Sequence, residues 1–367
     1  MKVLVLIEHG APSRYWEAAL PLLRSKGIDA SFATVRDLGP LSSALEERDV
    51  PVTSFDAVTS RDYPAAAWRL SKFLSAEKFD IVHACESIPA SISGVSSYLG
   101  RNAVRLFHRQ HNACPQRTRL FHNLANKTSD FMMTCSASTK DYAAEVDGFD
   151  REKISVAYNG INELRAVMDD DLGEIRKDLG ISGGSKVISI VGRLDLEKGH
   201  PTLFKAAENV AASLNEDLHI VVAGRGSQEE NLRELAASLK RVTVHFTGFH
   251  DDVAPWFLVG DIIVMPSTSE PFGLVAAEAM SSGRPLIACG VDGLLEVVED
   301  EVSGLLVPPD DDESLARAML RVFQSTELAT RLVTGGQKRV RDSFSMESMV
   351  DGWIACYSSI LERSKNG

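Results

Sequence analysis

The segment EPFGLVAAE (270–278) carries two glutamates, one in an expected loop and one on an expected helix. The proline and glycine near its start predict a loop, and residues 274–282 predict a helix. At such a helix start, the free main-chain N–H groups of Gly273, Leu274 and Val275 can face a phosphate, which the helix dipole also favours. The two carboxylates would then accept hydrogen bonds from neutral hydroxyl groups on either side of that phosphate.

A second segment, VGRLDLEKGH (191–200), places two cations in a short loop. Gly192 permits a close approach of the backbone, and Arg193 and Lys198 lie five residues apart. A planar guanidinium and a flexible ammonium together can neutralise a diphosphate leaving group as its bond breaks. Each segment alone could be an ordinary surface feature, but together they indicate a site for a diphosphate compound.

The elements that must position these residues alternate between short β-branched runs and longer helical stretches, which is typical of parallel sheets wrapped by helices. We expect strands at 3–7, 30–35, 80–84, 103–108, 131–136, 154–159, 186–192, 218–224, 242–248, 261–266 and 285–290, and helices at 14–26, 64–76 and 137–146. Because the apolar runs are uninterrupted, both faces of each sheet should be covered. The pattern predicts an α/β fold of two doubly wound, Rossmann-like parallel-sheet domains facing each other across a deep cleft, with ligands beyond the carboxyl ends of the strands.

The division into domains is expected from length and from one polar segment. A chain of 367 residues is long for one compact core, so two domains are expected. The acidic segment 166–185 ends in Ser-Gly-Gly-Ser and has the composition of a linker. It would separate an N-terminal domain at 1–165 from a C-terminal domain at 186–345.

The composition argues against several classes of protein. Hydrophobic residues make up 44% and charged residues 25% of the chain, as in ordinary soluble proteins, and no run of about 18 apolar residues could span a membrane. Five dispersed cysteines indicate reduced thiols and a cytoplasmic location. The net charge of -12 argues against a nucleic-acid partner. No residues have metal-ligand spacing, so we expect no metal and no other cofactor.

A basic run at 101–127 contains six arginines or lysines and no acidic residue. It is either a solvated face or a surface that attracts anions. Within it, His108 is the last residue of an expected strand, and His111 lies further into the loop that follows. A neutral imidazole there could hydrogen-bond one substrate and help to orient a second.

Three further residues are candidates for binding a second substrate. Glu86 and Asn112 fall in loops expected to rim the cleft, and Arg109 belongs to the basic run. If these residues act together with the basic run, the second substrate would carry phosphate or carboxylate groups.

The two motifs, in this order, resemble those of glycosyltransferase family 4, which are retaining enzymes of the GT-B fold. The resemblance covers nearly the whole chain and includes YNGIN (158–162), VAGRG (222–226), FTGF (246–249), PSTSEPFGLVAAEAMSSGRPLIA (266–288) and VSGLLVPPDD (302–311). It implies transfer of a sugar from a nucleoside diphosphate donor, with UDP- and GDP-sugars as the leading candidates. The acceptor would be a sugar, a lipid-linked compound or a small molecule, and peripheral contact with a membrane is compatible with the last two.

The resemblance also implies roles for individual residues. Arg193 and Lys198 would bind the donor diphosphate, Glu270 the transferred sugar and Glu278 the ribose hydroxyls. A histidine near the donor sugar, here His108 or His111, would complete the catalytic set. The remaining donor-binding positions implied are Gly10, Gly192, Gly248, Phe249, Phe272, Gly273, Leu274 and Val275. The last helix, at about 346–367, would pack back onto the N-terminal domain.

The sequence departs from the family pattern in two places. Family members often carry a Gly-Gly pair after the first strand, whereas the loop here, EHGAPSRYW (8–16), has only Gly10. The family's TDVGG is replaced by CGVDGLLEVVED (289–300), with its glycines differently spaced.

The mechanism and the reaction class retain alternatives. A double displacement would need a carboxylate nucleophile, for which the N-terminal domain offers no convincing candidate. Front-face departure and attack, in which the leaving phosphate takes the acceptor proton, needs only strong stabilisation of the diphosphate and no metal. A nucleotide-sugar 2-epimerase would share the fold, a dehydrogenase would need the absent Gly-x-Gly-x-x-Gly fingerprint, and a non-catalytic sensor would not need the full set of motifs.

Overall fold

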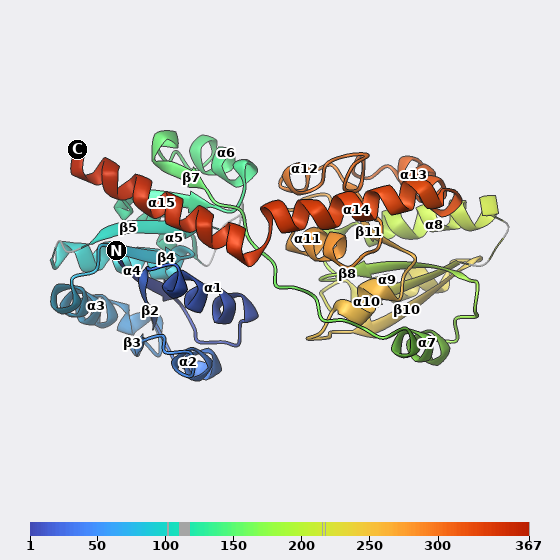
Figure 1. The fold of residues 1–367 in the computed structure, drawn as a ribbon. Coiled ribbons are helices and arrows are strands. Elements are labelled where there is room, and N and C mark those ends of the chain that lie inside the picture. Colours follow the sequence, from blue (N-terminus) through green and yellow to red (C-terminus); the bar gives the residue numbers. More distant parts are fainter. Residues whose placement is uncertain (101–102, 110–117, 215, 217, 367) are drawn as a thin grey trace. The chain divides into compact units, whose positions relative to one another are not determined.

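The computed structural model describes residues 1–100, 103–109, 118–214, 216 and 218–366 (Figure 1). The chain divides into two compact units. Unit 1 comprises Met1–Asn162 and Ser345–Gly367, and unit 2 comprises Glu163–Phe344. Each unit is a parallel sheet covered by helices, so the expected α/β class is confirmed. Among the described residues, no helix is both long enough and apolar enough to cross a membrane.

Unit 1 is built on a seven-stranded parallel sheet in the order β3-β2-β1-β4-β5-β6-β7. Its strands are β1 Lys2–Ile7, β2 Asp29–Thr34, β3 Val52–Ser54, β4 Ile81–Cys85, β5 Val104–Arg109, β6 Phe131–Thr134 and β7 Ile154–Val156. Its α-helices are α1 Arg14–Ser25, α2 Gly39–Glu46, α3 Tyr63–Glu77, α4 Ser87–Tyr98, α5 Arg119–Thr128, α6 Ala137–Glu145 and α15 Met346–Asn366.

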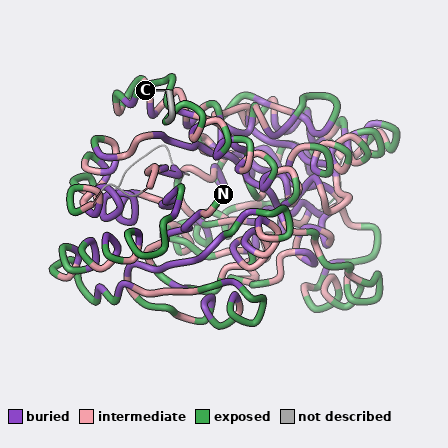
Figure 2. Tube along the Cα trace, turned by 60° about the vertical axis from the view of Figure 1, so that its left-hand side comes forward, coloured by how far each residue is buried: buried purple, intermediate pink, exposed green. Residues whose placement is uncertain are grey.

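Both faces of this sheet are buried because alternate residues of each strand enter different cores. Val3 and Val5 of β1 pack with α1, α2 and α15, whereas Leu4 and Leu6 pack with α3, α4 and α5 on the opposite face. The two helices α1 and α15, from opposite ends of the chain, lie side by side (Figure 1). Buried stretches follow the strands, and exposed residues recur along the helices (Figure 2).

Unit 2 is built on a six-stranded parallel sheet in the order β10-β9-β8-β11-β12-β13. Its strands are β8 Lys186–Val191, β9 Leu218–Ala223, β10 Val242–Gly248, β11 Ile262–Met265, β12 Leu286–Cys289 and β13 Leu305–Val307. Its α-helices are α7 Asp169–Asp178, α8 His200–Leu214, α9 Glu229–Ala237, α10 Ala254–Leu258, α11 Leu274–Ser281, α12 Leu294–Val297, α13 Asp312–Gln324 and α14 Thr326–Ser343.

The order of the strands reverses once in each sheet. The chain adds β2 and β3 on one side of β1 before returning to place β4 on the other side. In unit 2 it likewise adds β9 and β10 to one side of β8 and then β11 to the other. At such a reversal, the loops that follow the two neighbouring strands run in opposite directions. They leave a crevice at the carboxyl ends of these strands, which is where sheets of this kind bind ligands.

The segment 166–185, expected as a linker, is instead largely part of unit 2. It contains helix α7, and Ile175, Leu179 and Ile181 pack against Val187 of β8 within a small apolar cluster. The guanidinium of Arg176 donates to the carbonyl oxygen of Val259 at 2.6 Å. The polar composition of the segment reflects the exposed side of this helix, and its few apolar residues are enough to attach it.

The last helix, α15, is held in unit 1 by a buried aromatic cluster. Trp353 is 0% exposed, and its ring centroid lies 5.6 Å from that of Trp16 and 5.1 Å from that of His83. Large aromatic side chains bury the most apolar area per residue, so Trp353 should dominate the attachment of α15.

We predict that Trp353→Ala lowers the free energy of unfolding by about 3–5 kcal/mol, because it removes a large buried ring and leaves a cavity. Chemical denaturation followed by circular dichroism would measure the change. Trp68→Ala is the matched control, since the Trp68 side chain on α3 is 54% exposed and its loss should cost less than about 0.5 kcal/mol. Equal losses in both variants would contradict the prediction.

Candidate functional site

The two motif segments meet at the strand-order reversal of unit 2. One follows β8, the other follows β11, and these strands are hydrogen-bonded neighbours. The main-chain N–H of Thr268 donates to the carbonyl oxygen of Glu197 at 2.8 Å. Gly199 lies so close to the second loop that a Cβ atom on it would approach the Pro266 carbonyl oxygen to 1.9 Å. The crevice expected for this fold is therefore lined by the residues that the motifs single out.

An ion pair joins the two loops. Nζ of Lys198 lies 2.5 Å from a carboxylate oxygen of Glu270, and the side chains are 17% and 15% exposed. Arg193 is 68% exposed and pairs with Asp195 at 2.5 Å and with Glu197 at 2.8 Å. The structure thus brings the predicted cations and Glu270 together, each cation held by a carboxylate with which an anionic ligand would compete.

The start of α11 presents unpaired donors beside this ion pair. Gly273 adopts φ +102°, which favours glycine, and it caps the helix with no side-chain hydrogen bond. Within the described residues, the main-chain N–H groups of Gly273, Leu274 and Val275 donate to no acceptor. Unpaired N–H groups at the positive end of a helix can bind an anion, and the phosphate-binding role expected from the sequence stays a prediction.

Glu278 lies one turn further along α11 in a partly buried position. In the part of the chain that the structure describes, its carboxylate has no hydrogen-bond or ion-pair partner. Burial raises the pKa of this carboxyl to about 7 because the charged form is poorly solvated. A carboxylate without a protein partner is available to accept hydrogen bonds from a ligand, and the contact of Glu278 with ribose hydroxyls stays a prediction.

A segment that the sequence analysis did not assign supports the loop before α11. Asp292 has φ +42° and accepts hydrogen bonds from the Ser269 hydroxyl at 2.8 Å and from the Glu270 N–H at 3.1 Å. The N–H of Gly293 donates to the Glu270 carbonyl oxygen at 3.0 Å. A Cβ atom on Gly293 would lie 2.5 Å from the Pro271 carbonyl oxygen. The altered glycine spacing in this chain is therefore compatible with close support of the Glu270 loop.

A cavity of about 170 Å³ lies at the same place. It is lined by Ile190, Val191, Gly192, Arg193, Lys198, His200, Met265, Pro266, Ser267 and Val275. Of these, Gly192, Arg193, Lys198 and Val275 were expected site residues, and His200 and Ser267 are the polar side chains that were not. Burial, with a smaller effect of Lys198, lowers the pKa of His200 to about 4, so the ring is neutral at physiological pH. The sequence signal that could have found His200 is its position directly after the EKG motif.

The region expected to border the base lies at the end of β10. Gly248 has φ +82°, and its carbonyl oxygen accepts from the Gly224 N–H at 2.8 Å. Phe249 directly after it is 62% exposed, which is unusual for a large apolar side chain. An exposed ring at the carboxyl end of β10, on the edge of the sheet where ligands bind, is suited to stacking on a planar base.

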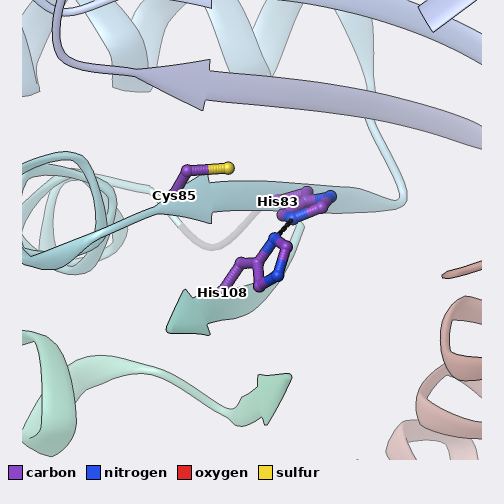
Figure 3. A group of neighbouring side chains, drawn as sticks. All are labelled: His83, Cys85 and His108. Carbon is purple, nitrogen blue, oxygen red and sulfur yellow. Dashed lines mark hydrogen bonds between the residues drawn. The ribbon is translucent and has the colours of Figure 1, made fainter. Parts of the chain in front are cut away.

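His108, one of the two histidine candidates, is buried in the core of unit 1. Its Nδ1 lies 2.8 Å from Nε2 of His83 (Figure 3). Nδ1 of His83 lies 2.6 Å from the Tyr357 hydroxyl. His108 is 0% exposed, and burial lowers its pKa to about 3. The expectation that this ring faces a substrate is wrong, because the ring is buried against α15, where its centroid lies 5.8 Å from that of Trp353.

Cys85 completes a buried group with the two histidines. The potential ligand atoms of His83, Cys85 and His108 lie within 4.8 Å of one another, and they are the one such group found among the described residues (Figure 3). Both ring nitrogens of His83 are already engaged in hydrogen bonds, and burial raises the pKa of the Cys85 thiol. These features are those of a packed polar core, so we assign no metal to the group.

Two cations of the basic run are neutralised by acidic residues from elsewhere in unit 1, whereas Arg101 and Arg117 lie outside the described residues. Arg109 is 2% exposed and is paired with Asp147, and Arg105 is paired with Asp130. Arg109 also lies over the ring of Tyr142. The expectation that Arg109 forms part of an anion-attracting surface is wrong, because its charge is buried and compensated within the unit.

The other candidates of unit 1 have different outcomes. Glu86 follows β4 and caps the start of α4 with φ +67°, a conformation that non-glycine residues rarely adopt and that is enriched at functional sites. Gly10 donates its N–H to the Asp37 carbonyl oxygen at 3.1 Å, and a Cβ atom on it would collide with Leu38. Packing therefore accounts for this glycine. His111 and Asn112 lie outside the described residues.

Comparisons with known proteins connect both halves of the chain to one group of enzymes. Residues 171–339 match the family model described as glycosyl transferases group 1. Residues 13–165 match the model described as glycosyltransferase family 4.

Curated relatives agree with these matches. An uncharacterized glycosyltransferase of Methanocaldococcus jannaschii is 30% identical over 63% of this chain and 60% of its own length. A D-inositol 3-phosphate glycosyltransferase of Salinispora arenicola is 33% identical over 61% and 54%. The lipopolysaccharide core biosynthesis glycosyltransferase LpsE of Rhizobium meliloti is 29% identical over 50% and 53%. The chain thus spans little more than half the length of the curated relatives it matches.

Solved structures share the fold along almost the whole chain. Anabaena HepE in complex with UDP superimposes with a TM-score of 0.79 at 23% identity, covering 98% of this chain and all of that one. A glycosyltransferase of Rickettsia africae gives a TM-score of 0.78 at 19% identity, covering 98% of each chain. The two sheets, the paired motifs and the two family models lead to one assignment: the chain belongs to the group 1 and family 4 glycosyltransferases, with the GT-B fold.

Proposed function

We propose that this protein transfers a sugar from a nucleoside diphosphate sugar to a hydroxyl group of an acceptor. The observation that carries the proposal is the start of α11, where unpaired N–H groups lie in the same crevice as Lys198 and Arg193. Helix N–H donors and two cations converge on a place where negative charge would develop as a diphosphate leaves. A neutral substrate would not make use of the charge of both cations and of the helix N–H donors together, as a diphosphate would.

The donor is proposed to be a UDP-sugar. HepE, which shares the fold, was solved with UDP, with UDP and glucose, and with UDP-glucose. The exposed ring of Phe249 would stack on the base, and the unpaired carboxylate of Glu278 would accept from the ribose hydroxyls. GDP-sugars are the second class to test, because neither contact reads the base by its hydrogen-bonding edge.

The proposed reaction breaks the bond between the anomeric carbon and the donor phosphate oxygen. Arg193, Lys198 and the N–H groups at the start of α11 stabilise the charge that the diphosphate gains. Glu270, released from its ion pair when Lys198 turns to the phosphate, accepts a hydroxyl of the transferred sugar. The acceptor oxygen attacks the same face of the sugar, and its proton passes to the leaving phosphate, so that configuration is retained. Because the chain's own cations supply the neutralisation, activity should survive chelation of metals.

The acceptor is proposed to be an anionic small molecule or a lipid-linked sugar. Among the relatives, one acts on D-inositol 3-phosphate and another functions in lipopolysaccharide core biosynthesis, by their names. The exposed Arg119 at the start of α5 is a cation that the structure does not bury. Inositol phosphates and lipid-linked sugars are therefore the first acceptors to supply.

A thermal-shift screen across nucleoside diphosphates and their sugars tests the proposal directly. A ligand that binds the native state raises the melting temperature by mass action. The donor found in this way would be incubated with candidate acceptors, and the anomeric configuration of the product would be read by NMR. Isomerised donor formed without acceptor would instead identify an epimerase, and no shift with any nucleotide would contradict the proposed function.

We predict that Lys198→Ala and Arg193→Ala each lower kcat by about 10²–10³-fold, because each removes a charge that stabilises the leaving diphosphate. Turnover at saturating donor would be measured against Lys338→Ala, which removes an exposed lysine paired with Asp342 on α14. The control should keep wild-type turnover. Near-normal kcat in the Lys198 variant would exclude it from the reaction.

We predict that donor affinity depends on the ionisation of Glu278. Since burial raises its pKa to about 7, the carboxyl of the free protein is protonated at lower pH and cannot accept from both ribose hydroxyls. Affinity for an intact nucleotide sugar should rise by up to about tenfold per pH unit from pH 5 and level off above pH 7.

Isothermal titration calorimetry across this pH range would measure the dependence. Glu278→Gln should bind more weakly at pH 8 and show a flat profile, because no group titrates at this position. The exposed Glu234 on α9 provides the matched control, Glu234→Gln, which should keep the wild-type profile. Parallel profiles for wild type and Glu278→Gln would exclude Glu278 as the titrating group.

A further inference from the structure

His200 is a buried histidine whose ring nitrogens have no partner. It begins α8 directly after Gly199 and is 1% exposed. In the part of the chain that the structure describes, neither Nδ1 nor Nε2 makes a hydrogen bond. Its side chain lines the 170 Å³ cavity together with Arg193 and Lys198.

An unpartnered imidazole in such a position is unfavourable for the free protein. A neutral ring carries one N–H donor and one acceptor nitrogen, and native proteins satisfy nearly all buried groups of this kind. Leaving a buried donor unpaired costs about 1–3 kcal/mol. An apolar residue would avoid this cost, so the histidine is best explained by a partner that is not part of the chain.

The surroundings of the ring indicate the chemistry of that partner. Lys198 lies two residues away, Arg193 lines the same cavity, and Val275 brings the start of α11 to it. Both cations and the helix start attract anionic oxygen, and Ser267 adds a hydroxyl to the same lining. A phosphoryl oxygen is the acceptor that all these groups would share.

The ring is also fixed in place. Gly199 before it has φ +65° and is packed against the Pro266 carbonyl oxygen, while Leu203 and Phe204 of the same helix are buried in the core of unit 2. Because burial and Lys198 lower its pKa to about 4, the imidazole remains neutral near pH 7. A fixed neutral donor can bind a phosphoryl oxygen without an additional charge to desolvate.

We propose that His200 is a donor-binding residue that donates a ring N–H to a phosphoryl oxygen of the nucleoside diphosphate. The inference rests on the proposed function, which supplies the diphosphate, and it gives a role to the last residue of the segment 191–200, for which the sequence analysis named none. The contact would raise affinity for the diphosphate part of the ligand and leave recognition of the nucleoside part unchanged.

The experiment compares wild type, His200→Leu and His200→Gln for binding of UDP and of uridine by titration calorimetry. His200→Leu should weaken UDP binding by about 10–100-fold, the usual worth of a hydrogen bond to a charged group. Its affinity for uridine should remain within about twofold of wild type. His200→Gln, which keeps an N–H donor on a flexible chain, should recover at least part of the lost UDP affinity.

The melting temperature of the ligand-free protein separates binding from a structural role. His200→Leu should melt at or above the wild-type temperature, because it removes unpaired polar atoms from the interior. Equal UDP affinity in wild type and both variants would overturn the role of His200 alone. A loss of stability in both variants, with UDP and uridine affinity falling together, would overturn it too. Failure of wild type to bind any nucleoside diphosphate would instead contradict the proposed function itself.

Discussion

The ion pair between Lys198 and Glu270 connects the two loops on which the site of unit 2 depends. The pair is mostly buried, and a buried pair stabilises a fold only weakly because both charges lose solvent. The role of this ion pair is therefore better explained by ligand binding, because the pair keeps Lys198 and Glu270 available to a ligand. A diphosphate that binds beside Lys198 replaces one carboxylate with an anion of higher charge and releases Glu270 to accept hydroxyl groups. One exchange of partners would then prepare both halves of the donor site.

Close backbone contacts hold the two loops that carry this ion pair at a fixed distance from each other. Gly199 packs on the Pro266 carbonyl oxygen, Gly293 packs on the loop at Pro271, and neither position has space for a Cβ atom. Gly273 adopts a left-handed conformation that directs the chain into α11. Glycine at these points fixes the distances between loops that come from different parts of the sheet. These distances in turn set the positions of the charged side chains on the loops. The motif glycines are thus part of the electrostatic arrangement.

Sequence patterns predicted elements more reliably than the direction of single side chains. Every strand expected from an apolar run forms, although β7 has only three residues, whereas β3 and β13, also of three residues each, were not expected. The donor motifs were recognisable because their spacing is local. His108 and Arg109 were misjudged because their environments depend on α15 and on Asp147, which are remote in sequence. Whether a strand residue points to core or crevice depends on such long-range packing.

The polar groups around the site of unit 2 differ in position from those in the core of unit 1. In unit 1, Arg109 pairs with Asp147, and His83 bonds to both His108 and Tyr357, while Nε2 of His108 and Nε1 of Trp353 have no partner among the described residues. In unit 2, the start of α11, the carboxylate of Glu278 and the ring of His200 lack partners among the described residues, and they lie around one crevice. Unpaired groups lower the stability of the free protein, and a ligand recovers that free energy only if it satisfies them. A nucleoside diphosphate offers phosphoryl oxygens to the N–H donors and ribose hydroxyls to the carboxylate. Specificity for this class of ligand would therefore follow from the polar groups that the fold leaves unpaired.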